Sequence, residues 1–142
     1  MAGYFTRLNG HVYEGRYKAQ VALSNGQFAI IANELVEETR AKKNNVLRVT
    51  EKTELFGMPA LRLEIVGGTD EVYMVENEWD YNDSQEFDES KYTCKVGEFV
   101  RMRRLLVGDQ VLVSVGADLH LAAAIGTEVQ PVEGGLLNFF TP

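Results

Sequence analysis

Short apolar segments separated by turn residues run along most of the chain, a pattern typical of many strands and few helices. Residues 18–23 alternate between polar and apolar side chains and lead into Ser24, Asn25 and Gly26. Asn and Gly tolerate the positive φ of a tight turn, and residues 27–32 then return as an apolar strand. We therefore predict a first β-hairpin in this region.

The middle of the chain contains three further strand candidates. Residues 46–50 follow a polar turn, and residues 61–65 alternate cleanly until the chain is broken at Gly67 and Gly68. Residues 72–75 are apolar and come soon after this break. We expect them to pair back on the preceding strand.

The last third of the chain has the clearest pattern. Residues 99–102, 110–115 and 128–132 are predicted strands with glycine turns between them. Residues 119–125, which hold two leucines and three alanines, suit a short helical turn as well as a strand. A pair of glycines then opens an apolar tail at about 134–142.

These elements predict an all-β or mostly β fold. We expect a small barrel or β-tulip-like domain of short antiparallel strands, with at most one or two short helices. A chain of 142 residues fits one domain with one core, so residues 1–142 are predicted to form a single β-rich domain. It has an aromatic leader at about 1–12 and the apolar tail at its other end.

The net charge of −7 and the isoelectric point near 4.8 argue against two classes of partner. Such a surface repels phosphate backbones and anionic lipid headgroups, so we expect no nucleic acid and no membrane as partners. The sequence has no apolar run of roughly 20 residues that would span a bilayer, and residues 1–7 lack the apolar region of a signal peptide. The protein is expected to stay in the compartment where it is made.

Residues 70–89 form the strongest charge asymmetry of the sequence, with nine acidic residues and no lysine or arginine. A calcium loop needs oxygen ligands at alternate positions around a central glycine, and no glycine occurs between Gly68 and Gly97. We therefore expect a solvated acidic loop and no metal site. The basic cluster at residues 101–104 is too small for a nucleic-acid surface, and we expect it to pair with the acidic segment of this chain or of a neighbouring subunit.

Candidate catalytic groups are few. They comprise His11, His120 and Cys94, and none stands in the sequence context of a known nucleophile or triad. We interpret all three as structural. The paired glycines lack the flanking residues of a phosphate-binding loop and are predicted turns. No catalytic residue, cofactor site or metal site is therefore predicted, and the protein is expected not to be an enzyme.

Three segments of the C-terminal half resemble a known family. They are Lys-Val-Gly-Glu-Phe-Val at 95–100, Leu-Val-Gly-Asp-Gln-Val-Leu-Val at 106–113, and Ile-Gly-Thr-Glu-Val-Gln-Pro-Val-Glu-Gly-Gly at 125–135. Together with the opening hairpin, they resemble the head decoration or cement proteins of tailed bacteriophages. The resemblance covers about a third of the chain and assigns no active-site residue.

The resemblance implies a virion protein, made in the host cytoplasm, that binds the outer surface of an assembled capsid and strengthens it. Its expected partners are the major capsid protein lattice and two further copies of itself in a homotrimer. Aromatic residues at both ends either pack on the domain or contact the partner, and we name Tyr4, Phe5, Phe139 and Phe140 as candidate contacts. The alternatives are another phage structural component, such as a tail or connector subunit, and a small oligomeric hydrolase.

Overall fold

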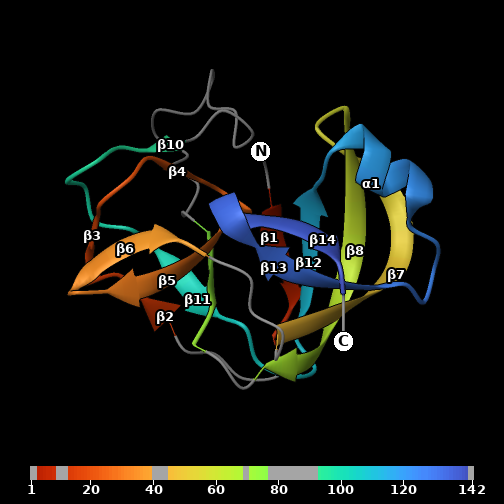
Figure 1. Ribbon diagram of the computed structural model, residues 1–142, viewed down its shortest axis with the longest axis horizontal. Coiled ribbons are helices and arrows are strands. Elements are labelled where there is room, and N and C mark those ends of the chain that lie inside the picture. The colour runs from red at the N-terminus through yellow and green to blue at the C-terminus, as the bar shows by residue number, and fades with distance from the viewer. Residues whose placement is uncertain (1–2, 9–12, 40–44, 69–70, 77–92, 141–142) are drawn as a thin grey trace.

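The computed structural model describes residues 3–8, 13–39, 45–68, 71–76 and 93–140 (Figure 1). Strands make up 58% of the structure, and the described residues contain one short α-helix, α1 (Ala117–Ala122). The predicted mostly β class with at most one or two short helices is therefore confirmed. The helix begins two residues before the stretch 119–125, for which the sequence suited either a helical turn or a strand, and overlaps its first four residues.

Two six-stranded sheets and one two-stranded sheet make up the fold. The terminal sheet, named for the first and last strands at its two edges, consists in order of β1 (Gly3–Arg7), β12 (Gln110–Ser114), β8 (Met58–Gly68), β7 (Asn45–Leu55), β13 (Glu128–Val132) and β14 (Leu136–Phe139). The central sheet consists of β2 (Tyr13–Glu14), β11 (Met102–Arg104), β9 (Tyr73–Val75), β5 (Phe28–Ala32), β6 (Leu35–Glu38) and β3 (Lys18–Ala19). The small sheet pairs β10 (Thr93–Cys94) with β4 (Leu23–Ser24).

The predicted strands at 46–50 and 61–65 belong to one long hairpin, β7–β8, with 11 residues in each strand. Its turn is formed by Phe56 and Gly57, with φ angles of 52° and 77°. Two left-handed residues match the right-handed twist of the strands that they join. The hairpin supplies the two middle strands of the terminal sheet, so it is the scaffold on which both edges are built.

The predicted first hairpin is wrong. The strand before the turn at residues 24–26 is β4, which pairs with β10, while β5 after the turn pairs with β6 and β9. The real hairpin is β5–β6, because Asn33 and Glu34 both adopt left-handed φ angles, of 52° and 63°. β3 also pairs in parallel with β6, so the expectation of antiparallel strands fails for this pair.

Strand β9 differs from the prediction as well. It pairs with β5 and β11 in the central sheet and not with the preceding strand β8. Each β9 residue is buried: Met74 lies in the core between the two large sheets, and Tyr73 and Val75 lie in a second core. A strand covered on both faces belongs in the middle of a sheet, which explains its place there.

Two hydrophobic cores lie on opposite faces of the central sheet. Along β5, Phe28 belongs to the main core and Ile30 packs against it, whereas Ala29 and Ile31 contact the second core. This alternation follows the two-residue period of a strand. The main core also contains the inward residues of the β7–β8 hairpin, so the terminal and central sheets pack face to face. Figure 1 shows α1 beside one end of this hairpin.

The predicted barrel does not close among the described residues, where β1 and β14 remain separate edges of an open sheet. The segment entering β5 passes between them. A Cβ atom added to Gly3 of β1 would lie 2.6 Å from the Cα atom of Gly26, and one added to Gly135 would lie 2.5 Å from the carbonyl oxygen of Phe28. Gln27 also donates a hydrogen bond of 2.7 Å to the carbonyl of Gly134. This segment keeps the two edges apart.

Candidate functional site: the two edges of the terminal sheet

The four aromatic residues predicted as contacts lie at or next to two different edges. Tyr4 and Phe5 are in β1, Phe139 ends β14, and Phe140 follows it. Tyr4 and Phe139 are 38% and 39% exposed, whereas Phe5 is half-buried against the main core. The leader and the tail therefore contribute integral strands that pack on their own domain. The structure does not bring the four side chains together into one patch.

The β1 edge is covered by an acidic side chain. The backbone N–H of Phe5 donates a hydrogen bond of 2.6 Å to Oε2 of Glu76, and the other oxygen of Glu76 accepts one of 3.0 Å from Nε of Arg103. The pairing of β1 with β12 is also shifted between Phe5 and Arg7. A charged group against an edge and an irregular register both hinder the addition of another strand.

The β14 edge has a different character. Its pairing with β13 is regular over all four residues, from Leu136 opposite Val132 to Phe139 opposite Val129. The N–H of Phe140 donates to the carbonyl of Glu128, so in an antiparallel ladder the backbone groups of Leu137 and Phe139 point away from β13. Phe139 donates its outward N–H to the side chain of Asn138 at 2.8 Å.

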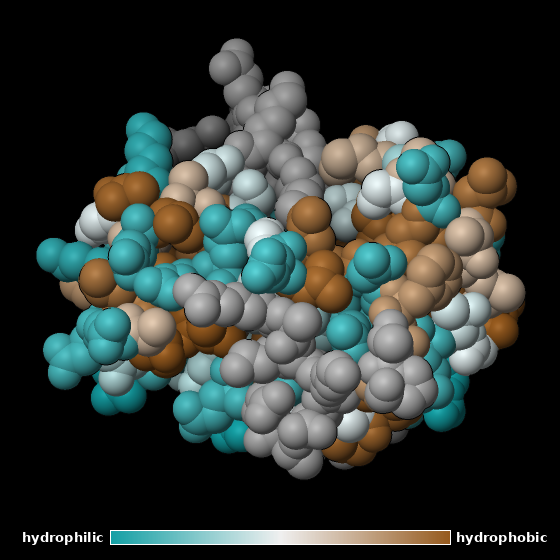
Figure 2. Space-filling view, in the orientation of Figure 1, coloured by the Kyte–Doolittle hydropathy of each residue, from teal (hydrophilic) through white to brown (hydrophobic). Residues whose placement is uncertain are grey.

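Apolar side chains are also exposed at this edge. Leu136 is 47% exposed and Phe139 is 39% exposed. In the space-filling view, hydrophobic side chains reach the surface over β13 and β14 between hydrophilic neighbours (Figure 2). The β14 edge is therefore regular and partly apolar, whereas the β1 edge is irregular and charged.

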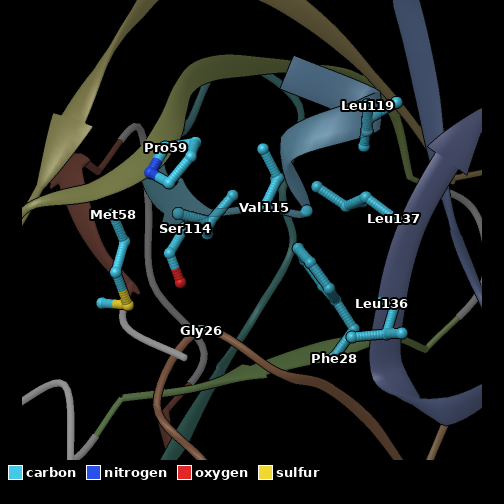
Figure 3. Close-up of a pocket in the computed structure, with 11 residues that line it drawn as sticks. Gly26, Phe28, Met58, Pro59, Ser114, Val115, Leu119, Leu136 and Leu137 are labelled. Carbon is cyan, nitrogen blue, oxygen red and sulfur yellow. The ribbon is translucent and has the colours of Figure 1, made fainter. Parts of the chain in front are cut away.

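A cavity of about 410 Å³ opens in the gap between β12 and β14. Its walls are mainly apolar and include Phe28, Met58, Val113, Leu119, Leu136 and Leu137. Figure 3 shows Leu119 and Leu137 on one side of the cavity, and Met58 and the hydroxyl of Ser114 on the other. Gly116 also lines the cavity, and a Cβ atom added there would meet no atom within 4 Å. The volume is in the range of pockets that bury a ligand or a large side chain.

An acidic groove of about 280 Å³ lies next to the cavity. Glu37, Glu38 and Glu133 line it, together with Gln20, Val21, Thr39 and Gly134. Gln27 connects the two sites: its amide contacts Oε2 of Glu38 at 3.5 Å and the carbonyl of Gly134 in the groove, and its neighbours Gly26 and Phe28 line the cavity. Three carboxylates without a basic side chain in the lining give the groove a negative potential.

The basic cluster pairs with acidic residues of the same chain, as one of the two predicted alternatives required. Besides the Arg103–Glu76 pair, Nη1 of Arg104 lies 4.0 Å from Glu71, whose side chain is 72% exposed. Residues 77–92, which hold most of the acidic segment, lie outside the described residues. Within the described part of the acidic segment, Glu76 connects the β1 edge to Arg103 through its two carboxylate oxygens.

An ion pair also lies at an edge of the central sheet. Glu14 in β2 is buried and accepts hydrogen bonds from the side chain and backbone of Arg16, with a shortest distance of 2.8 Å. The side-chain hydrogen bond from Arg16 contributes most to holding the pKa of Glu14 below its ordinary value, against the opposing effect of burial. Burial conversely raises the pKa of Tyr73.

The residues considered as catalytic candidates lie apart. Nε2 of His120 in α1 is 3.1 Å from the carbonyl oxygen of Thr53, which fixes the helix to the β7–β8 hairpin. Cys94 is fully buried in β10, with its thiol 3.6 Å from the carbonyl oxygen of Phe99. His11 lies outside the described residues. Within the described ranges, no group of three or more His, Cys, Asp or Glu is placed to hold a metal ion.

Sequence reasoning missed the cavity, the groove and the role of Glu76. The apolar run that begins at Leu136, directly after Gly134 and Gly135, was the available signal for a further strand, but nothing near it in sequence indicated the facing residues of β8 and β12. In the described part of the chain, no helix is long and apolar enough to cross a bilayer. No protein-family model matches the chain, and neither a curated protein nor a solved structure matches it.

Proposed function

We propose that the protein is a head decoration protein of a tailed bacteriophage, which binds the outer surface of the assembled capsid and stabilises its lattice. In this proposal the protein acts by binding and performs no catalytic step. Its partners are the major capsid protein and, in a homotrimer, copies of itself, while nucleic acid and membranes have no part. The protein is made in the host cytoplasm and ends on the exterior of the virion.

The observation that carries the proposal is the placement of the two aromatic segments at opposite edges of one sheet. Tyr4 and Phe139 each keep more than a third of their surface exposed although they belong to integral strands. Partly exposed aromatic side chains on a rigid support are frequent anchors in protein interfaces. The resemblance of the segments at 95–100, 106–113 and 125–135 to decoration proteins supports the same function.

Several equivalent contacts explain why such a protein binds a lattice and not a free subunit. A trimer with three weak contacts exceeds the affinity of one contact by about 10² to 10⁴ when all three engage at once. The contact surfaces stand together only in the assembled capsid. We therefore expect tight binding to expanded capsids and weak binding to free capsid subunits.

Co-sedimentation with capsids of the same phage tests this function. Wild-type protein should pellet with expanded capsids and stay in solution with free subunits. Tyr4→Ser and Phe139→Ser should each weaken the binding and leave the fold intact, with Phe56→Ser, a change of an exposed turn residue, as the control. Point substitutions are preferable to truncations because β1 and β14 are integral strands whose loss would disturb the sheet. Failure of the wild-type protein to bind any capsid form would reject the proposed function.

A further inference from the structure

Four strands lie at the edges of the two large sheets, and three of them discourage the addition of a further strand. β2 and β3 contain two residues each, which is too short to support a long ladder. β1 has a shifted register and the carboxylate of Glu76 against its outward amide at Phe5. β14 is regular and partly apolar, and the hydrogen bond on its outward side at Phe139 comes from the neighbouring Asn138 side chain, so a further strand would meet the least resistance there.

The geometry of β14 directs such a strand toward the cavity. Leu137 and Phe139 present their backbone groups outward, and the side chain of Leu137 packs against the main core. In an antiparallel pair, residues directly opposite each other place their side chains on the same face. The residue opposite Leu137 would therefore extend into the cavity that Leu137 lines, where an apolar side chain finds apolar walls.

The charge around β14 defines the partner further. Glu37, Glu38 and Glu133 line the groove next to the start of this strand, and the whole chain carries a net charge of −7. A segment bound along β14 would pass beside these carboxylates. Charge complementarity therefore favours a lysine or an arginine close to the apolar residue and disfavours an acidic segment.

We infer that the β14 edge, the cavity and the acidic groove together bind one extended segment of the capsid subunit. The segment adds a strand to the terminal sheet, inserts an apolar side chain into the cavity and places a lysine or arginine against the groove. This mode of recognition takes affinity from backbone hydrogen bonds and specificity from the side-chain pocket. The inference rests on the proposed function, since that function supplies the capsid subunit as the partner.

A peptide titration tests the recognition chemistry without capsids. The probe is a short peptide of alternating valine and threonine, with a central leucine and a lysine at each end. Added to the full-length ¹⁵N-labelled protein, it should shift the amide signals of Leu137, Phe139, Val115 and Leu119 saturably. The same peptide with glutamates in place of the lysines should bind at least about tenfold more weakly. The absence of saturable shifts, or shifts confined to β1, would overturn the inference.

Two matched pairs of variants locate the site. Gly116 lines the cavity and a Cβ atom there meets no other atom within 4 Å, so Gly116→Leu adds a large side chain at the cavity wall and should weaken peptide binding at least about tenfold, whereas Gly116→Ala should leave it unchanged. Glu133→Lys should weaken binding and reduce its dependence on salt, whereas Glu71→Lys, at an exposed residue that lines neither the cavity nor the groove, should have little effect. Equal affinities within either pair would count against the cavity or the groove as part of the site.

Co-sedimentation then separates the inference from the proposed function. If wild-type protein and Gly116→Ala pellet with capsids and Gly116→Leu does not, the inference is supported. If all three pellet equally, the inference fails and the proposed function stands. If the peptide binds but neither the wild-type protein nor either Gly116 variant pellets with capsids, the capsid subunit is rejected as the partner, together with the proposed function. Sedimentation velocity covers the remaining case: an oligomer that Gly116→Leu dissociates would show that a second copy occupies the site.

Discussion

The two edges of the terminal sheet show that one sheet can protect one boundary and leave the other open. At β1, a carboxylate, an arginine and a register shift occupy the edge. At β14, the ladder is regular, the backbone of Leu137 points outward and a cavity opens alongside. An exposed regular strand is an aggregation hazard that proteins usually guard against. The contrast between the protected β1 edge and the open β14 edge therefore supports the proposed binding of a partner segment at β14.

The largest effect should come from removing the side chain that stands between the two edges. Phe28→Ala deletes a fully buried ring of the main core that also lines the cavity, so we expect a loss of about 3 to 5 kcal/mol in the free energy of unfolding. Urea unfolding followed by circular dichroism would measure it. Phe56→Ala, at a residue 50% exposed in the hairpin turn, should change little. Similar losses for both variants would contradict the assigned role of Phe28.

The next largest effect should come from removing the charge of Glu76 from the β1 edge. Glu76→Gln weakens the charged hydrogen bonds to the amide of Phe5 and to Arg103, and we expect a loss of about 1.5 to 3 kcal/mol. The variant should also self-associate more readily on heating, because the β1 edge then loses its charge. Glu71→Gln, at an exposed residue 4.0 Å from Arg104, is the matched control and should stay near the wild type. A stable, monodisperse Glu76→Gln protein would refute the guarding role.

A smaller effect should follow from adding a charged side chain to the β14 edge. Phe139→Lys adds a charge to the open edge at a half-exposed position, so the free energy of unfolding should change by less than about 1 kcal/mol. Light scattering during slow heating should show less association than in the wild type. Tyr4→Lys, at an equally exposed residue of the edge that Glu76 already covers, should leave association unchanged. Equal changes in association for the two variants would contradict the proposed difference between the two edges.

The smallest effect concerns the edge strand β2 of the central sheet. Arg16 holds the pKa of Glu14 below its ordinary value, so folding favours the ionised carboxylate. This stabilisation is present above the pKa of the unfolded chain, near 4.5, and is lost as the pH falls through the lower pKa of the folded protein. Glu14→Gln should therefore destabilise the protein at pH 7 more than at pH 3. Thermal melts at both pH values would reveal an equal effect if the prediction is wrong.

Local patterns predicted the strands better than their partners. The alternation at residues 61–65 placed part of β8, and the stretch 128–132 matched β13 residue for residue. The turn predicted at Gly67 and Gly68 is wrong, because both glycines belong to β8 and pair with β7. The β5–β6 turn was missed because Glu34 takes a left-handed conformation that glutamate rarely adopts. The pairing of β4 with β10 joins residues about 70 positions apart, and no local pattern encodes it.

Of the candidate site, only the aromatic residues near the two termini could be predicted from the sequence. The aromatic residues near each terminus were visible in the sequence, but not their placement on opposite edges of one sheet. Glu76 stood within a run of acidic residues, and only the fold brings it to Phe5, 71 residues away in sequence. The cavity combines residues of β5, β8, β12, α1 and β14, so it exists only once the tertiary structure has formed.

The order in which this sheet can assemble follows from its strand order. The β7–β8 hairpin is local and can form as soon as both strands have left the ribosome, whereas β1 must wait for β12, more than 100 residues later. β14 joins last, and with it come Leu136 and Leu137, which complete the cavity wall. A nascent chain that has already folded its hairpin still lacks the open edge and its pocket. Synthesis itself thus delays the proposed recognition surface until the other strands of this sheet are in place.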